Sequence, residues 1–509
     1  MARLQDTIAG LGTLQANARP SAWQLSWPLL VGIYVFGMAL YDGHFLQLML
    51  IDGDTYWHIA AGQWILEHAA VPAYDPFSHS MHGAPWTAQE WLSEVLLARA
   101  HDLGGWSGVV AVTGACFASA FALLTRALLR TMEPLRALLF ATLAVMLAVG
   151  HLLARPFVLA MPLLMVWVIE LVRASDERRT PGLWLLPVMT LWANLHGGFT
   201  LGIALAFAFA FEALLEARGS GRMPEVMRSW GFFLLLAVGS ALLTPHGVQA
   251  FWFTWQVLAQ DTYALDRIGE WASPNFHSYQ PLEVWLLGGL ALVLHQGLRL
   301  PPVRLVLLLG LLHLGLKHVR NVELLGLIGP LVVAAPFAAQ WRELERGKRA
   351  SGPGKDHVLP SKLARPAGFA TCVAAVLVMA GASLTLSRVH PVELPEFTVP
   401  AKALAAARAA GVKGPVLNDY GWGGYLIYSG IPPFIDGRSD MYRDAFMRRH
   451  FDAVELASPG SLEQLLEQYG ITWTLLRPGT PAIALLDRSP GWRRIYADKT
   501  AVVHSKVDP

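Results

Sequence analysis

Long apolar stretches that recur along the chain constrain its fold more than any other feature. A helix needs roughly 20 apolar residues to cross a bilayer, and eleven stretches reach or approach that length. We expect membrane-spanning helices near residues 27–46, 106–125, 138–153, 157–172, 183–195, 200–215, 230–243, 284–298, 303–316, 322–339 and 368–386. The fifth and sixth could instead form one bent hairpin around His196-Gly197-Gly198. Only 15% of the residues are charged, against about 25% in soluble domains, which favours a polytopic α-helical membrane protein.

The distribution of arginine and lysine predicts how these helices are oriented. Cytoplasmic segments of membrane proteins carry an excess of both residues. With eleven spans and a cytoplasmic N-terminus, most of them fall on the cytoplasmic side, including a dense group within residues 342–365. We therefore expect a multi-pass protein of the cytoplasmic (inner) membrane, with the region after residue 388 outside the cytoplasm. Residues 1–20 lack the apolar core of a cleavable signal peptide.

Net charge and cysteine content argue against two other classes of protein. The net charge of +2 gives no reason to expect nucleic-acid binding. Cys116 and Cys372 both lie inside apolar stretches, so we expect no disulfide framework.

We divide the chain into a membrane module, residues 1–388, and a soluble α/β domain, residues 389–509. The first outer loop, residues 47–105, is too long for a simple connector. It is expected to hold two tryptophan-rich amphipathic helices at the membrane interface, residues 54–68 and 86–100. Residues 343–366 are basic and rich in glycine and proline, which predicts a flexible cytoplasmic linker. In the soluble domain we expect helices at 401–410, 445–456 and 461–468, and strands at 415–417, 426–428, 433–435, 472–476, 492–497 and 501–504.

Two carboxylates follow the first apolar stretch and are the leading candidates for chemistry. Asp52 and Asp54 could share a divalent cation, or one could act as a base while the other pairs with a cation. Asp54 also suits the N-cap of a helix that starts at the next residue. His58 lies one helical turn after Asp54, so the two side chains could pair.

Further polar residues are predicted to lie at the outer ends of the spans. Such groups are costly within a membrane and tend to line cavities. The candidates for substrate binding are His58, Glu90, Arg155, His196, His246, Glu270, His318 and Arg320, together with Arg438 of the soluble domain. Alternatively, each is an ordinary loop residue, Glu90 and Glu94 form a solvated helix face, and Arg438 is tied in a turn by Asp436 and Asp440. Acidic and basic side chains are thus expected on the same, outer side of the membrane, which indicates an anionic substrate, or a metal with a phosphate.

An acidic residue in a large first outer loop resembles the GT-C superfamily of membrane glycosyltransferases. Within it, the chain most resembles a group of bacterial membrane proteins. The matching segments are residues 52–67, 74–79, 90–94, 155–157, 192–199, 244–247, 270–276, 320–321, 422–425 and 436–440. The Trp-Trp-Asp signature of oligosaccharyltransferases is missing, so N-glycosylation of proteins is not indicated.

This resemblance implies inverting transfer of a sugar from a polyprenyl-phosphate donor to an acceptor outside the cytoplasm. Asp54 or Asp52 would deprotonate or orient the acceptor hydroxyl, while Arg155, Arg320 and the histidines would bind the leaving phosphate. Members of the superfamily differ in their need for metal, so Mg²⁺ or Mn²⁺ at Asp52 and Asp54 is left open. The alternative functions are a transporter or flippase of a lipid-linked anion, and a non-catalytic membrane assembly protein.

Overall fold

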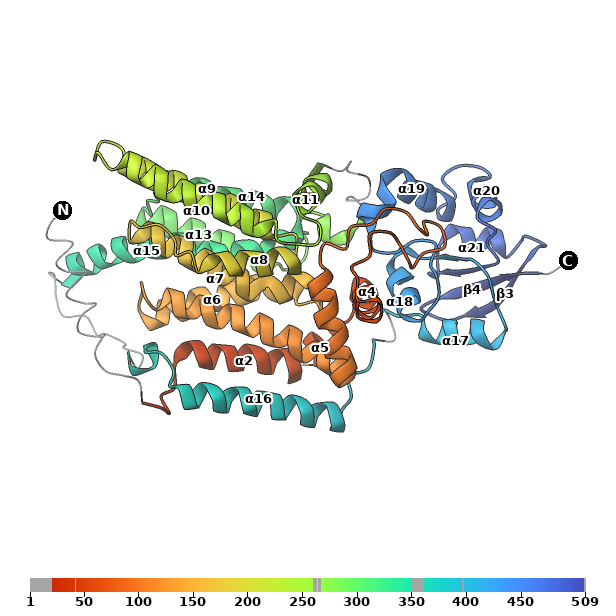
Figure 1. Ribbon diagram of the computed structural model, residues 1–509. Coiled ribbons are helices and arrows are strands. Elements are labelled where there is room, and N and C mark those ends of the chain that lie inside the picture. Colours follow the sequence, from red (N-terminus) through yellow and green to blue (C-terminus); the bar gives the residue numbers. More distant parts are fainter. Residues whose placement is uncertain are drawn as a thin grey trace.

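A computed structural model describes residues 21–41, 43–259, 263, 267–349, 361–395 and 398–507. Long helices run side by side in a bundle, and a small sheet with its own helices lies beyond one end of that bundle (Figure 1). The structure thus confirms a mostly helical chain with a small C-terminal sheet.

Each of the eleven predicted spans overlaps a helix of the bundle. These helices are α2 (Trp27–Tyr41), α5 (Trp91–Leu128), α6 (Pro134–Ala148), α7 (Pro156–Asp176), α8 (Leu185–Leu195), α9 (Phe199–Ala217), α10 (Met223–Ala241), α13 (Pro281–Gln296), α14 (Pro302–Lys317), α15 (Val322–Arg349) and α16 (Phe369–Val389). In the described part of the chain, six helical segments are long and apolar enough to cross a membrane, within α5, α6, α7, α9, α15 and α16. Three shorter apolar helices are α2, α8 and α13. A crossing number of eleven therefore stays a prediction.

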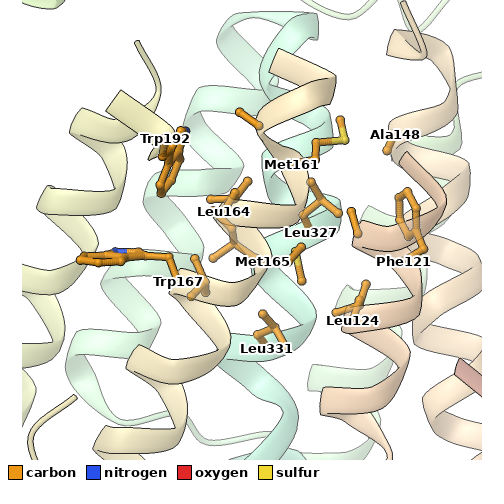
Figure 2. Close-up of a cluster of buried hydrophobic side chains, with 14 of the residues drawn as sticks. Phe121, Leu124, Ala148, Met161, Leu164, Met165, Trp167, Trp192, Leu327 and Leu331 are labelled. Carbon is orange, nitrogen blue, oxygen red and sulfur yellow. The ribbon is translucent and has the colours of Figure 1, made fainter. Parts of the chain in front are cut away.

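Close packing between helices forms the centre of the bundle (Figure 2). The buried side chains there include Phe121, Leu124, Ala148, Met161, Leu164, Met165, Trp167, Trp192, Leu327 and Leu331. Trp167 Nε1 donates a hydrogen bond to the carbonyl of Gly202 at 2.8 Å, and a Cβ on Gly202 would meet the ring of Trp192 at 2.5 Å. In lipid such tight packing drives helix association, because the lipid tails are as apolar as leucine.

A break inside α5 separates its outer-loop portion from its apolar portion. The backbone leaves helical geometry at Gly104 and at Gly105, which has φ 57° and ψ −148°. Glycine adopts such positive φ values without the steric cost that a Cβ would add. The predicted helix over residues 86–100 is wrong at its start, because α5 begins at Trp91.

Several short elements lie between the long helices or before them in the chain. They are α3 (Gly43–Met49), α4 (Asp54–His68), η1 (Val149–His151), α11 (Gln249–Ala259), η2 (Gly269–Trp271), η3 (Val319–Asn321) and η4 (Ser361–Ala364). The helix predicted over residues 54–68 is confirmed at both ends by α4. The predicted linker over residues 343–366 is helical at its start, since α15 continues to Arg349. Residues 350–360 of that linker, and the predicted cytoplasmic N-terminus at residues 1–20, lie outside the described residues.

The C-terminal part folds around a four-stranded sheet of order β1-β2-β4-β3. Its elements are α17 (Ala401–Ala409), β1 (Val416–Asn418), η5 (Tyr420–Trp422), α18 (Gly423–Tyr428), α19 (Ser439–Val454), α20 (Ser461–Gln468), β2 (Trp473–Leu476), α21 (Pro481–Leu486), β3 (Trp492–Ala497) and β4 (Val502–Lys506). β1 pairs with β2 in parallel, and β4 is antiparallel to both β2 and β3. The strands predicted at 426–428 and 433–435 are wrong: the first lies in α18, and the second pairs with no strand in the described sheet.

Candidate active site

The first outer loop delivers two carboxylates at the start of α4. Asp52 Oδ1 accepts a hydrogen bond from the backbone N–H of Asp54 at 3.0 Å, which satisfies one of the amides that a helix start leaves open. The predicted capping role of Asp54 is therefore wrong, because Gly53 holds the N-cap position and the carboxylate that accepts the amide is that of Asp52. Asp54 Oδ1 accepts a hydrogen bond from Trp57 Nε1 at 3.0 Å, and this bond holds its carboxylate against the helix.

Arg155 joins three carboxylates that come from different parts of the chain. It lies directly before α7. Its Nε is 2.6 Å from Asp52 Oδ2, its Nη1 is 2.5 Å from Glu270 Oε2, and its Nη2 contacts Asp54 Oδ2. Burial lowers the pKa of Arg155, but the carboxylates of Asp52 and Glu270 outweigh burial and raise that pKa above its usual range. Arg155 is therefore a permanent positive charge at the centre of the site.

Glu270 bridges Arg155 to a second arginine. Its Oε1 is 2.9 Å from Nη1 of Arg320, whose guanidinium lies over the ring of Trp271 at 4.5 Å from the ring centre. Burial raises the pKa of Glu270, but the two arginines outweigh burial and hold that pKa below its usual range. We call Asp52, Asp54, Arg155, Glu270 and Arg320 the arginine–carboxylate cluster.

A second group of side chains, the histidine–glutamate cluster, consists of His58, Glu90, Glu94 and His196. Glu90 lies between the two rings: its Oε2 is 3.8 Å from His58 Nε2, and its Oε1 is 3.3 Å from His196 Nε2. Glu94 Oε1 lies 3.5 Å from the other nitrogen of His58. Burial lowers the pKa of His58 and of His196 to about 3, so both rings are neutral at pH 7. Burial, together with the Glu94 carboxylate, raises the pKa of Glu90 to about 8.

The geometry of this cluster corrects two predictions. Among the described residues, no hydrogen bond or ion pair joins His58 to Asp54; His58 lies against Glu90 and Glu94 instead. The solvated-face alternative is wrong for Glu94, whose side chain is 1% exposed. It fails because α4 packs directly on this turn of α5, where a Cβ on Gly62 would overlap the carbonyl of Glu94.

Two predicted histidines make contacts with loop backbone. His246 Nε2 is 3.0 Å from the carbonyl oxygen of Ala88, just before α5. His318 Nδ1 is 2.5 Å from the carbonyl oxygen of Trp271, next to Glu270. Both rings thus hold the loops that present site residues.

Arg438 is buried between the first outer loop and the C-terminal part. Its side chain is fully buried, with Nη2 2.7 Å from Asp436 Oδ2 and Nη1 2.7 Å from Asp75 Oδ1. The structure favours the tied-turn interpretation over a sugar or phosphate contact. The second partner is Asp75 of the first outer loop rather than Asp440, so the bridge joins that loop to the C-terminal part.

Glycines of the C-terminal part, which the sequence alone does not assign to the site, lie against Gly53 and Asp54 of the first outer loop. A Cβ on Gly437 would overlap Asp54 Oδ1, and one on Gly424 would overlap the carbonyl of Gly53. Likewise, a Cβ on Gly53 would overlap the carbonyl of Gly421. The glycine-rich sequence 421–424 is the one signal that could have shown this contact. In Figure 1, α4 and α18 lie at the junction between the bundle and the sheet.

The residues of the site do not fit a divalent cation. The oxygens that Mg²⁺ or Mn²⁺ would need from Asp52 and Asp54 are engaged by the guanidinium of Arg155 and by two N–H donors. In the part of the chain that the structure describes, no group of three or more His, Cys, Asp or Glu side chains is arranged to hold a metal ion. Arg155 supplies the positive charge at that place.

Comparison with solved structures identifies the fold. The archaeal oligosaccharyltransferase AglB from Archaeoglobus fulgidus, in complex with an inhibitory peptide and a dolichol-phosphate, matches over 88% of this chain and 69% of its own, with 10% identity and a TM-score of 0.55. The chain has a GT-C-like fold. Its resemblance to the GT-C glycosyltransferases, expected from the first outer loop, is thereby confirmed at the level of structure.

Two further solved structures also match the chain. The apo form of the Archaeoglobus fulgidus enzyme has a TM-score of 0.52, with 10% identity over 88% of this chain and 69% of its own. ArnT from Cupriavidus metallidurans bound to undecaprenyl phosphate matches over 94% of this chain and 97% of its own, with 13% identity and a TM-score of 0.47. No protein-family model and no curated protein sequence matches the chain.

Proposed function

We propose that the protein transfers a sugar from a polyprenyl-phosphate-linked donor to an acceptor at the outer face of the cytoplasmic membrane. The observation that carries this proposal is the arginine–carboxylate cluster at the end of a GT-C-like helical bundle. It brings acidic groups for an acceptor hydroxyl next to two arginines for a phosphate. An AglB neighbour that shares the fold was solved with a dolichol-phosphate, which supports a lipid-linked donor.

The proposed chemistry is a direct displacement with inversion at the anomeric carbon. The acceptor hydroxyl forms a new C–O bond as the bond from carbon to the phosphate oxygen breaks. The electron pair of that bond goes to the phosphate, and the hydroxyl proton goes to the carboxylate of Asp54. Arg155 and Arg320 stabilise the charge that develops on the leaving phosphate, as preorganised cations do in other active sites.

The histidines have a different part in this chemistry from the one expected. Because His58 and His196 are neutral at pH 7, they can each donate one N–H but add no positive charge. The charge that a leaving phosphate requires therefore comes from the arginines. We assign His196 and Glu90 to orienting the donor beside them.

An apolar groove next to the histidine–glutamate cluster suits the polyprenyl chain of the donor. It has a volume of about 640 Å³ and is lined by Trp91, Leu92, Leu186, Pro187, Thr190, Leu191, Asn194, Ser240 and Leu243. At its polar end, Trp91 Nε1 donates a hydrogen bond to Asn194 Oδ1 at 2.9 Å. Trp91 follows Glu90 in sequence, and Asn194 is two residues from His196, so the groove leads toward the site.

The alternative of a transporter or flippase of a lipid-linked anion is not favoured. Such proteins use charged groups within their spans. Here Glu212 is paired with Arg304 at 3.0 Å, and Glu170 with Arg179 at 2.7 Å. Both pairs are complete without a substrate.

Substitution of Asp54 tests the proposal. In purified protein, Asp54→Asn is expected to lower sugar release from polyprenyl-phosphate sugars, with membrane extract as the source of acceptor, by at least about 100-fold, the range of general acid–base catalysis. Asp102→Asn is the matched control, because Asp102 belongs to the same loop and its pair with Arg99 is solvent-exposed. Full activity of both Asp54→Asn and Asp52→Asn would show that neither aspartate is catalytic.

A further inference from the structure

Glu270 occupies the space between the two arginines that the proposed function assigns to the donor phosphate. One of its carboxylate oxygens meets Arg155 at 2.5 Å, and the other meets Arg320 at 2.9 Å. Carboxylate and phosphate oxygens compete for the same guanidinium N–H groups, and both can bind two donors at once. A carboxylate in this position is negatively charged and binds two donors, as the donor phosphate that is expected there would.

The other nitrogens of Arg155 already contact carboxylates. Nε and Nη2 of Arg155 are engaged by Asp52 and Asp54. Arg320 is held over the ring of Trp271, so its guanidinium cannot turn freely away. Within the described residues, Glu270 is the acceptor that the two arginines share.

Glu270 is also placed where it can leave. It lies on the short helix η2 rather than in the bundle, and its side chain is 22% exposed. His151 at the end of η1 lies near Glu270, and burial lowers the pKa of His151, so its ring is neutral at pH 7. Nδ1 of His151 is buried and has no hydrogen-bond partner among the described residues, so it offers a second position for the carboxylate.

We propose that Glu270 is an internal anion that fills the phosphate site, and that the donor phosphate displaces it from Arg155 and Arg320. This inference rests on the proposed function, because it assigns the two arginines to the donor. Displacement of Glu270 makes the site selective for lipids that carry a phosphate, because a neutral lipid brings no negative charge to replace the carboxylate. The competing interpretation is that Glu270 only positions the arginines, in which case its removal weakens phosphate binding.

Binding of undecaprenyl phosphate to the full-length protein separates these interpretations. We expect Glu270→Gln and Glu270→Ala to bind it on the order of tenfold more tightly than the unaltered protein, the scale of one charge-assisted hydrogen bond. Undecaprenol, which lacks the phosphate, is expected to bind all three proteins equally. Unchanged or weaker binding of undecaprenyl phosphate by both variants would overturn the inference.

A matched variant controls for loss of one negative charge. Glu283 lies in the first turn of α13, and among the described residues no ion pair joins it to either arginine. Glu283→Gln is expected to bind undecaprenyl phosphate as the unaltered protein does; a gain equal to that of Glu270→Gln would mean a general charge effect and overturn the inference. Failure of the unaltered protein both to bind undecaprenyl phosphate and to release sugar would overturn the proposed function itself.

Discussion

Arg155 is the central residue of the site, and carboxylates surround its guanidinium group. Arg155 presents its donors in a fixed plane, and three acidic side chains contact its three different nitrogens. Asp52 and Asp54 reach it together because only Gly53 separates them. This arrangement fixes the direction of Asp54 before any substrate arrives. It also engages the oxygens that a metal ion would need from this pair of carboxylates.

Glu90 predicts a pH dependence of donor binding. Its pKa is raised to about 8 by burial and by the neighbouring Glu94 carboxylate. Below pH 8 the side chain is mostly protonated and neutral; above pH 8 it is ionised and repels an anion. The second ionisation of a phosphate monoester, near pH 6, is already complete in this range. The affinity for undecaprenyl phosphate is therefore expected to fall on the order of tenfold between pH 7 and pH 9.

The Glu90→Gln variant is the control for this titration. Glutamine keeps the shape of the protonated acid and stays neutral, so this variant is expected to show a smaller fall in affinity from pH 7 to pH 9. The remaining fall comes from Glu94, because burial raises its pKa to about 8 as well. His58 and His196 cannot supply the effect, because the pKa of each ring is about 3. If Glu90→Gln retained the same fall in affinity, another group would be responsible and the assignment of Glu90 would be wrong.

At the scale of elements, glycine contacts join the first outer loop to the C-terminal part. Gly424 lies in α18, and a Cβ there would overlap the carbonyl of Gly53. Alanine would favour the helix by about 1 kcal/mol, but overpacking against a backbone atom typically costs about 1–3 kcal/mol. We expect Gly424→Ala to lower the unfolding temperature, to expose the C-terminal part to proteolysis and to reduce sugar transfer because Asp54 shifts.

A second glycine provides the comparison for this variant. Gly491 lies in a turn before β3, and a Cβ there would meet no atom within 4 Å. Gly491→Ala is expected to match the unaltered protein in unfolding temperature and activity. Equal behaviour of Gly424→Ala and Gly491→Ala would show that the close contact at Gly53 is not important.

Local sequence patterns predicted the exact bounds of some helices and strands, and the predictions for others were wrong. Apolar spacing was sufficient for α4, α20 and β3, whose bounds are as predicted. It failed for α18, where consecutive glycines indicate a turn but are required by the approach of α4. It also failed for the start of α5, because Trp86 is buried in extended chain rather than in a helix.

The site was predictable as a gathering of residues but not as a set of pairs. Topology alone brings the ends of the spans to one side, so it indicated that Asp54, Arg155, Glu270 and Arg320 meet. The pairing of Arg438 with Asp75 joins residues 363 positions apart, and no local pattern carries that information. The same holds for Glu94, whose burial depends on the packing of α4.

At the scale of the whole molecule, the bundle holds two separate networks of charged side chains, one near each end. The arginine–carboxylate cluster includes Asp54 of α4 and Arg155 directly before α7, and α4 lies at the end of the bundle where the sheet is placed (Figure 1). A separate buried network joins the C-terminal halves of α7 and α9 to the start of α14, through Arg304 and its contacts with Asp176 and Glu212. Within the described residues, no hydrogen bond or ion pair links this network to the arginine–carboxylate cluster. Such a separation is expected when one end of the bundle is rigid and the other end binds substrate.

Because the arginine–carboxylate cluster lies at the sheet end of the bundle, the topology of the protein bears on its function and can be tested. If the sheet end is outside the cytoplasm, a membrane-impermeant maleimide should label Ser458→Cys in intact cells, because Ser458 lies in an exposed turn before α20. Ser220→Cys, in the exposed turn between α9 and α10, should react only after the membrane is opened. Both variants are made in protein with Cys116 and Cys372 replaced by alanine. The reverse pattern would place the arginine–carboxylate cluster in the cytoplasm, where it would meet a different donor pool and acceptor from those proposed.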